Sequence, residues 1–125
     1  MKIYLANSLT QAPEEFKRQM LNLREKLKED YEVLEYMGLA DGDAVSVYRH
    51  DIDCVKSCDA VVAEVSFPST GLGIEIATAL QNGKKVLAFA KTEARVSRMV
   101  QGIADKNFSF RRYGEIDEIL KNIKE

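Results

Sequence analysis

The run at residues 60–65, AVVAEV, constrains the fold more than any other stretch of this chain. Its apolar, mostly β-branched residues follow one another without alternation, a pattern typical of a strand that is buried on both faces of a parallel sheet. Such a strand needs helices on both sides of it, which indicates an α/β protein. Residues 66–73 then read as a loop rich in hydroxyl groups and glycine, and Glu75 stands at the start of the apolar helix expected next.

The rest of the chain continues this alternation of strand and helix. Strands are expected at residues 2–6, 31–35, 60–65, 85–90 and 108–112. Helices are expected around Phe16, Met20, Leu23 and Leu27, around Tyr48, Ile52 and Val55 up to about Cys58, and at residues 73–82, 96–104 and 115–124. A loop is expected at 38–43. The order predicts a Rossmann-like or flavodoxin-like sandwich of about five mostly parallel strands with helices on both faces, one domain spanning 1–125.

The charge balance limits the partners that this chain can have. It has 125 residues, 18 Lys and Arg against 20 Asp and Glu, and a net charge of -2. No basic field exists to hold a nucleic acid polymer or an anionic membrane. No apolar stretch reaches the roughly 18 residues of a spanning helix, so we expect a cytoplasmic protein with a small-molecule ligand.

Cys54 and Cys58 follow His50 at successive spacings of four residues, which places all three on one stripe of a helix. The outer two backbones then stand roughly 12 Å apart, whereas zinc ligands must all lie about 2.0–2.3 Å from one ion. We therefore interpret the cysteines as small apolar side chains. Neither a metal nor another cofactor is expected.

The loop at residues 66–73 is the candidate binding element. In open α/β sheets, ligands bind beyond the carboxyl ends of the strands. The glycines allow a ligand to approach the backbone, the hydroxyl groups of Ser66, Ser69 and Thr70 can donate hydrogen bonds, and a helix N-terminus favours an anion. The loop matches neither the P-loop nor the dinucleotide motif. Glu75 is then either a carboxylate of the site or a first-turn acid that stabilises its own helix.

Three segments together resemble a known family. They are HDIDCVKSCDAVVAEVSFPSTGLGIEIATAL at 50–80, YLANSL at 4–9 and SRMVQGIAD at 97–105. They resemble the nucleoside 2-deoxyribosyltransferase superfamily, and within it the 2'-deoxynucleoside 5'-phosphate N-hydrolase branch. The resemblance implies that Glu75 is the catalytic nucleophile and that Asp51 engages the sugar and assists catalysis. It also implies that Ser69 binds the 5'-phosphate, and that Ser97 does so across the interface of a homodimer.

The resemblance further implies that the first strand and its loop contact the substrate. The residues it places there are Tyr4, Ala6, Asn7, Ser8 and Leu9, with Gly71 and Gly73 in the later turn. The chain departs from the hydrolase branch in this first loop, where residues 7–12 read NSLTQA and lack an Arg-Gly-Gly sequence. An Arg supplies both charge and bidentate geometry to a phosphate. Arg98 and Lys91 are either substitutes for it or ordinary surface charges.

Cleavage of an N-glycosidic bond passes through an oxocarbenium-like state, which a carboxylate can stabilise and then trap as an ester. Together with this chemistry, the resemblance implies a hydrolase of 2'-deoxynucleoside 5'-monophosphates. A deoxyribosyltransferase that exchanges bases on unphosphorylated deoxynucleosides, and a noncatalytic nucleotide-binding module, stay open as alternatives. Phe67 either stacks on a base or covers the core. Glu64 either lines the site or pairs with a neighbour.

Overall fold

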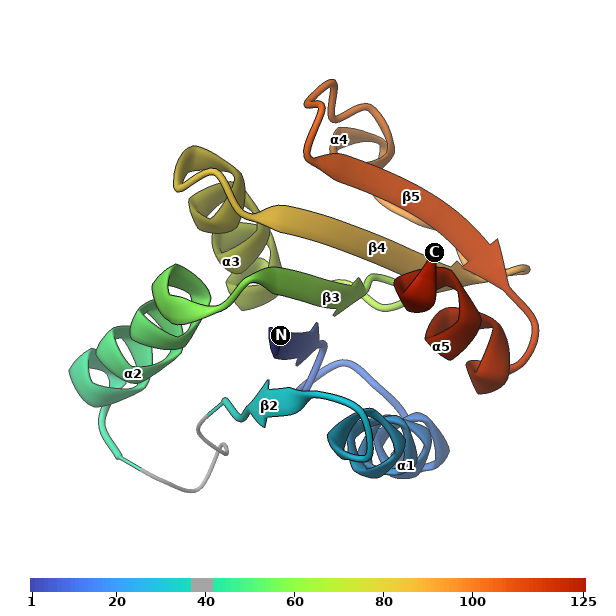
Figure 1. The fold of residues 1–125 in the computed structure, drawn as a ribbon, viewed down its shortest axis with the longest axis horizontal. Coiled ribbons are helices and arrows are strands. Elements are labelled where there is room, and N and C mark those ends of the chain that lie inside the picture. Colours follow the sequence, from blue (N-terminus) through green and yellow to red (C-terminus); the bar gives the residue numbers. More distant parts are fainter. Residues whose placement is uncertain (37–41) are drawn as a thin grey trace.

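The computed structural model describes residues 1–36 and 42–125, whose strands form one parallel sheet in the order β2-β1-β3-β4-β5 (Figure 1). The strands are β1 (Lys2–Asn7), β2 (Glu32–Leu34), β3 (Ala60–Glu64), β4 (Lys85–Lys91) and β5 (Phe108–Tyr113). The helices are α1 (Glu14–Lys28), α2 (Ala44–Ser57), α3 (Thr70–Gln81), α4 (Arg98–Gln101) and α5 (Ile116–Lys124). The predicted fold class, a five-stranded parallel sheet with helices on both faces, is confirmed.

Helices cover both faces of the sheet, and each face has its own core cluster. The predicted apolar stripe of α1, Phe16, Met20, Leu23 and Leu27, is fully buried and packs with α5 on one face. Helices α2, α3 and the residues around α4 pack on the other face. Successive residues of β3 alternate between the clusters, since Val61 and Ala63 belong to one and Val62 to the other. The central strand is therefore buried on both faces, as its unbroken apolar run predicts.

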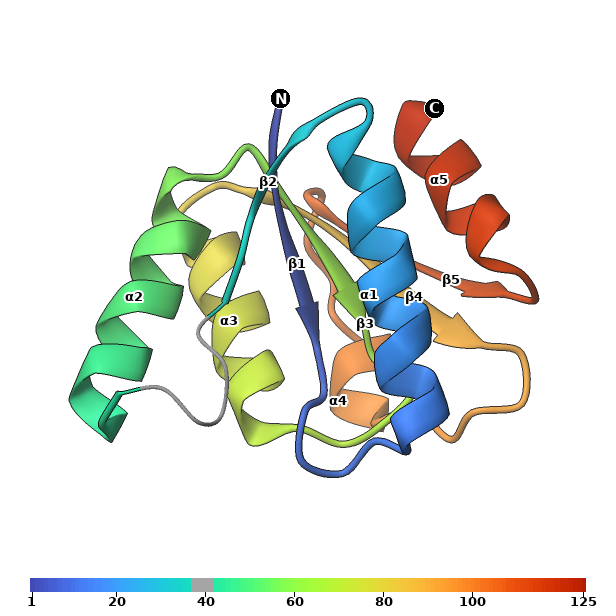
Figure 2. The same cartoon turned by 90° about the horizontal axis from the view of Figure 1, so that it is seen from below.

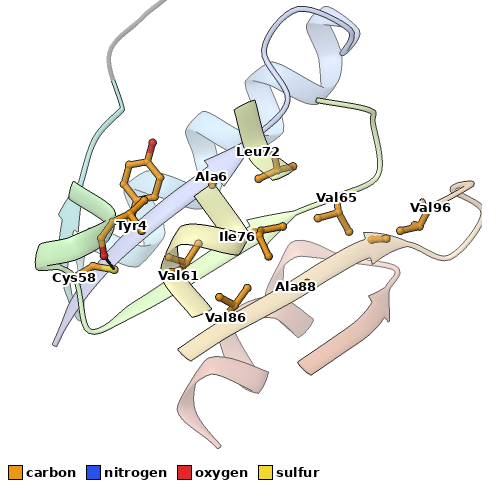
Figure 3. Packing of buried hydrophobic residues seen from close by; sticks show 14 residues of the cluster. Tyr4, Ala6, Cys58, Val61, Val65, Leu72, Ile76, Val86, Ala88 and Val96 are labelled. Carbon is orange, nitrogen blue, oxygen red and sulfur yellow. Dashed lines mark hydrogen bonds between the residues drawn. The ribbon is translucent and has the colours of Figure 1, made fainter. Parts of the chain in front are cut away.

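The core cluster on the α2/α3 face includes Tyr4, whose side chain extends to the candidate site. Figure 3 shows Leu72 and Ile76 of α3 among the valines and alanines of β3 and β4, with Tyr4 at the border of the cluster. The Tyr4 ring is inaccessible to solvent, while its hydroxyl group points away from the other labelled side chains. The ring is thus fixed by packing, and its hydroxyl is left for a polar partner.

Two predicted helices differ from the observed ones in their bounds. Helix α3 begins at Thr70, three residues before the predicted start, because the Ser69 hydroxyl oxygen accepts a hydrogen bond from the Leu72 N–H and caps the helix. The helix predicted at 96–104 is a single turn, α4, which Gly102 ends. Its apolar residues Val96, Val100 and Ile103 still pack against the core, so their spacing reflects burial of a turn rather than of a long helix.

The remaining bounds agree to within one or two residues, although most of the loop predicted at 38–43 lies outside the described residues. Asp43 accepts a hydrogen bond from the Ser46 N–H at 2.8 Å and starts α2. No helix in the part of the chain that the structure describes has the length and apolar character needed to cross a membrane.

Candidate active site

A cavity of about 650 Å³ opens at the carboxyl ends of β1 and β3, on the face of the sheet that α2 and α3 cover. In Figure 2 the strands run downward, and the loops after β1 and β3 lie at the lower end. The strand order reverses between β1 and β3, since β2 lies on one side and β4 on the other. This is the switch point at which doubly wound sheets bind ligands, because the connections leave it in opposite directions.

Glu75 lies on the wall of this cavity, in the second turn of α3. It is therefore not a first-turn acid, and the interpretation that it stabilises only its own helix N-terminus is wrong. Its carboxylate oxygen Oε2 accepts a hydrogen bond from the Tyr4 hydroxyl group. Burial raises the pKa of Glu75 to about 7, the negative charge of Asp51 adds to this, and the hydrogen bond from Tyr4 opposes it.

Asp51 reaches the same cavity from α2, so two carboxylates from different helices line one space. Its side chain is 16% exposed, and its Oδ1 lies 3.0 Å from Nδ1 of His50. Burial and the nearby charges of Glu75 and Asp51 raise the pKa of Tyr4 well above its usual range. Tyr4 thus keeps its proton and acts as a hydrogen-bond donor to Glu75.

The loop before α3 differs from the glycine-rich binding loop that the sequence predicts. Gly71 and Gly73 lie inside the first turns of α3, neither has a positive φ, and a Cβ atom on either would meet nothing within 4 Å. Gly71 lines the cavity and Gly73 does not. The contribution of the two glycines to ligand binding therefore stays a prediction, and in this chain Ser69, Thr70 and Gly71 at the start of α3 form this part of the cavity wall.

Of the five residues predicted to contact the substrate from the first strand and its loop, three line the cavity. Tyr4, Asn7 and Leu9 line the cavity. Ala6 is 1% exposed and packs in the core, and Ser8 is fully buried, with its hydroxyl group donating to the Pro68 carbonyl oxygen at 3.0 Å. Ala6 and Ser8 therefore lie behind the cavity wall, and Ser8 ties the loop after β1 to the loop before α3.

Ser97 lies away from the cavity of its own chain. It is exposed, and its hydroxyl oxygen accepts a hydrogen bond from the Met99 N–H at 3.2 Å at the start of α4. Neither Arg98 nor Lys91 lines the cavity. Among the described lining residues there are three carboxylates, of Asp43, Asp51 and Glu75, and there is no Lys, Arg or His. The cavity of one chain is thus acidic.

With this geometry in place, the chain can be compared with known proteins. A sequence model of the family described as nucleoside 2-deoxyribosyltransferase matches residues 3–111. The chain belongs to the nucleoside 2-deoxyribosyltransferase family. The match includes all five strands, except the first residue of β1 and the last two of β5, and the elements that line the cavity. Within this family the cavity at the β1/β3 switch point is the candidate active site.

Named relatives within the family include nucleotide N-hydrolases. A Thermofilum pendens protein named after the 2'-deoxynucleoside 5'-phosphate N-hydrolase reaction is 42% identical over 79 residues, which span 62% of this chain and 55% of that protein. The human 5-hydroxymethyl-dUMP N-hydrolase is 36% identical over 86 residues, 65% of this chain and 49% of that protein. The chain thus spans about half the length of these relatives.

Solved structures share the fold. The Clostridium botulinum CMP N-glycosidase BcmB superposes with a TM-score of 0.71 at 22% identity, over the whole of both chains. A 2-desoxiribosyltransferase from Leishmania mexicana superposes with a TM-score of 0.63 at 22% identity, over 92% of this chain and 81% of that one. At this identity the likeness concerns the arrangement of strands and helices.

Several residues that line the cavity were not identified from the sequence. The sequence places Tyr48 in the helix with Ile52 and Val55, but does not identify it as a cavity residue; it is 57% exposed and lines the cavity. Ala44, Val47, Tyr48 and Asp51 follow the helical spacing of three and four residues, so they share one face of α2. The spacing of three residues between Tyr48 and the candidate Asp51 is the signal that would have found Tyr48. Thr10, Gln11 and Tyr36, which also line the cavity, carry no such pattern.

Phe67 and Glu64, whose roles the sequence left open, and Cys58 lie outside the cavity. Phe67 is half-buried, and its ring packs edge-on against Phe16 with 4.8 Å between the ring centroids, so it covers the core. Cys58 is buried in the core, as predicted for a small apolar side chain. Glu64 is 1% exposed and bonds to Ser66 and Tyr113, so it is a partnered carboxylate behind the site.

Proposed function

We propose that this chain hydrolyses the N-glycosidic bond of 2'-deoxynucleoside 5'-monophosphates, releasing the free base and deoxyribose 5-phosphate. One observation carries the proposal. Glu75 presents a carboxylate to a cavity at the switch point of the sheet, held by the hydroxyl group of Tyr4 and accompanied by Asp51. The names of the relatives, which are N-hydrolases of deoxynucleotides, support the same reaction class.

In the proposed reaction Glu75 attacks the anomeric carbon of the sugar. The bond from this carbon to the base nitrogen breaks as the bond to the Glu75 oxygen forms, and the base leaves with the electron pair and takes up a proton. Water then attacks the same carbon and gives up one proton, which balances the proton taken up by the base; this frees Glu75 and leaves a hydroxyl group on the sugar. Asp51, on the facing helix, engages the sugar and assists this exchange. A 2'-deoxy sugar favours the cationic state because it lacks an electron-withdrawing hydroxyl group.

The pKa of Glu75 fits this role. A nucleophilic carboxylate must be ionised, and at a pKa of about 7 roughly half of Glu75 carries its charge near neutral pH. Tyr4 stabilises the ionised form through its hydrogen bond. Burial, which raises this pKa, also keeps bulk water away from the carboxylate and strengthens its interaction with a positive sugar carbon.

The 5'-phosphate is proposed to lie at Ser69 and the start of α3. The N-terminus of this 12-residue helix lies at the cavity, where its free N–H groups favour an anion. The acidic lining of a single chain opposes a phosphate. Because the family resemblance implies that Ser97 reaches the site of a neighbouring chain, we propose a homodimer in which the partner's Ser97 adds a further hydroxyl donor to the site. The exposure of Ser97 and of Met99, which is 86% exposed, leaves this segment free to meet a second chain.

The same acidic lining supports one alternative, a deoxyribosyltransferase acting on unphosphorylated deoxynucleosides. Three carboxylates without a cation among the described lining residues suit an uncharged sugar better than a phosphate. Both reactions begin with the same attack by Glu75 and differ in the acceptor, which is water in one and a second base in the other.

Chromatography of the products from a panel of deoxynucleoside monophosphates, ribonucleotides and nucleosides, with and without a second base, separates these reactions. We expect free base from at least one deoxynucleoside monophosphate, released faster than from the matching ribonucleotide. Quenched enzyme should carry a sugar adduct on the peptide that contains Glu75. Base exchange on nucleosides alone would establish the transferase instead, and no turnover of any substrate would favour a binding module.

A mixing experiment tests the shared site. Glu75→Ala and Ser97→Ala chains, each weakly active alone, should recover activity when combined, because one pocket of the mixed dimer then has both native residues. A monomer in sedimentation, or mixtures no more active than the sum of their parents despite subunit exchange, would contradict the dimer.

A further inference from the structure

A second buried carboxylate lies on the other face of the sheet. Glu64 ends β3, two residues after Val62, and both side chains point to the face that α1 and α5 cover. Glu64 Oε1 accepts a hydrogen bond from the Ser66 N–H at 2.6 Å. Its Oε2 accepts from the Ser66 hydroxyl group at 2.9 Å and from the Tyr113 hydroxyl group. Both oxygens of Glu64 are therefore hydrogen-bonded within the protein, and Glu64 does not line the cavity.

A carboxylate in this place is unfavourable unless its partners hold it. Burial raises the pKa of Glu64, whereas the hydrogen bonds from Tyr113 and Ser66 and the charge of Lys91 lower it. Burial and the Glu64 charge raise the pKa of Tyr113 above its usual range, so Tyr113 keeps its proton as a donor. A buried polar group that loses a hydrogen-bond partner destabilises the folded state, because its desolvation is no longer compensated. The hydrogen bonds of this network therefore hold its members in place.

The network joins the ends of three strands at Ser66. The Ser66 hydroxyl oxygen accepts a hydrogen bond from the Lys91 N–H at the end of β4, at 2.8 Å. Tyr113 is the last residue of β5, and Glu64 is the last residue of β3. Ser66 is thus fixed from β3 and β4 directly and from β5 through Glu64.

Ser66 also opens the segment that forms one wall of the cavity. Pro68 and Ser69, two and three residues later, line the cavity, and Ser69 caps α3. Between them and Ser66, Phe67 packs on Phe16. Pro68 is tied from the opposite side by the hydrogen bond from Ser8. A displacement of Ser66 therefore moves Ser69 and the start of α3 relative to the cavity.

The structure assigns Glu64 the role of a positioning residue that, together with Tyr113 and Ser66, sets the position of residues 66–69 and hence of Ser69 at the cavity. It acts through Ser66 and does not touch the substrate. Its effect on substrate binding rests on the proposed function, in which Ser69 contacts the 5'-phosphate. Its effect on the segment itself does not.

The first test therefore needs no substrate. Tyr113→Phe removes one donor to Glu64, and Ser66→Ala removes the link to the Lys91 N–H. Tyr31→Phe is the matched control, because its ring packs against the same core cluster without bonding to Glu64 or Ser66. Hydrogen exchange is followed at a fixed interval below the melting temperature of each protein. The amides of Ser66 and Leu72 should exchange about tenfold faster in the first two variants, with β1 and the control unchanged.

The second test compares substrates with and without the phosphate. In the Tyr113→Phe and Ser66→Ala variants, KM for the deoxynucleoside monophosphate that the panel shows to be turned over fastest should rise about tenfold, because a small misplacement of Ser69 weakens its contact. The KM for the matching unphosphorylated deoxynucleoside, the kcat and the pH dependence of kcat should stay as in the native protein, since Glu75 keeps its partners.

The outcomes separate the two proposals. Exchange that rises throughout the protein, or not at all near Ser66, would show that the network only stabilises the core and would overturn the positioning role. Equal changes in KM for both substrates would overturn it as well. If the native protein turns over no deoxynucleoside monophosphate of the panel, the proposed function fails, and the exchange experiment still decides the role of Glu64.

Discussion

The protein carries two pairs of a glutamate and a tyrosine, one on each face of the sheet, of which Glu64 is buried and Glu75 half-buried. On the α2/α3 face the Tyr4 hydroxyl group donates to Glu75, and on the α1/α5 face the Tyr113 hydroxyl group donates to Glu64. Burial raises the pKa of both carboxylates. The pairs differ in access, since Glu75 lines a cavity of about 650 Å³ and Glu64 is 1% exposed.

They also differ in how much of each carboxylate is already used. Glu64 accepts hydrogen bonds from the Ser66 N–H, the Ser66 hydroxyl group and Tyr113. Glu75 accepts one from Tyr4 among the described residues. A carboxylate has about four acceptor sites, of which Glu64 uses three and Glu75 uses one among the described residues, so Glu75 keeps more capacity for a ligand. The same two residue types thus give a reactive group on one face and a structural group on the other.

The largest expected difference between the two glutamates is the loss of enzymatic activity when each is replaced by glutamine. Glu75→Gln removes the nucleophile while its amide oxygen can still accept from Tyr4, so turnover should fall at least about 1,000-fold with the fold intact. Glu64→Gln should lower kcat/KM by no more than about tenfold, because it alters only the support of residues 66–69. Steady-state rates on a substrate found in the panel, with circular dichroism as control, measure both. Comparable losses would contradict the division of roles.

Replacement by alanine should reverse the order when stability is measured. Glu64→Ala leaves the Tyr113 hydroxyl group and the Ser66 N–H buried without an acceptor, and each such group costs about 1–3 kcal/mol. The free energy of unfolding should fall by about 3 kcal/mol or more. Glu75→Ala should lower it by less than about 1 kcal/mol at pH 5, since water in the cavity can reach the Tyr4 hydroxyl group. Urea unfolding tests this, and equal losses would show that Glu75 is also structural.

The stability of the protein should depend on pH through Glu75. In the unfolded chain its pKa is near 4.5, and in the folded chain it is about 7. Below the lower value both states hold the proton. Between the two, the unfolded chain releases its proton first, so the native protein loses stability as pH rises. Above about 7 the loss is complete, at most about 3 kcal/mol.

Glu75→Gln removes this titration. The variant should therefore unfold at a higher urea concentration than the native protein at pH 8, with a smaller difference at pH 4.5. Tyr31→Phe, at a site remote from the cavity, serves as the control for general pH effects. A difference between native protein and variant that does not change from pH 4.5 to pH 8 would show that burial does not raise the pKa of Glu75.

The fold follows from the sequence because its signals are local. An unbroken apolar run predicts a strand buried on both faces, and Phe16, Met20, Leu23 and Leu27 mark the inner face of α1. The errors lie where one side chain sets a boundary. The Ser69 cap starts α3 early, and Gly102 stops α4 after one turn. Spacing alone does not reveal which of several serines or glycines ends an element.

The site was less predictable, because its parts come from distant positions. Tyr4 and Glu75 are 71 residues apart, and no spacing in the sequence indicates that one donates to the other. The family resemblance supplied Asp51 and Glu75, and the structure brings both to one cavity. It did not reveal the exposed Tyr48, and the sequence left the place of Glu64 open. The exposure of Tyr48 and the position of Glu64 depend on how helices and strands pack against one another, which cannot be predicted from the sequence of each element alone.

The smallest expected effects concern the pH dependence of activity and test what surrounds Glu75. The proposed nucleophile must be ionised, so kcat/KM should rise with pH along a limb centred near 7. Asp51→Asn removes a negative charge that raises the pKa of Glu75, so the limb should move to lower pH. Tyr4→Phe removes the hydrogen bond that lowers this pKa, so the limb should move to higher pH. Opposite shifts from two neighbours of one carboxylate are expected only if that carboxylate is the titrating group. Measured on the residual activity of both variants, shifts in the same direction would assign the limb to another group, and Tyr113→Phe, at the other pair, should leave it in place.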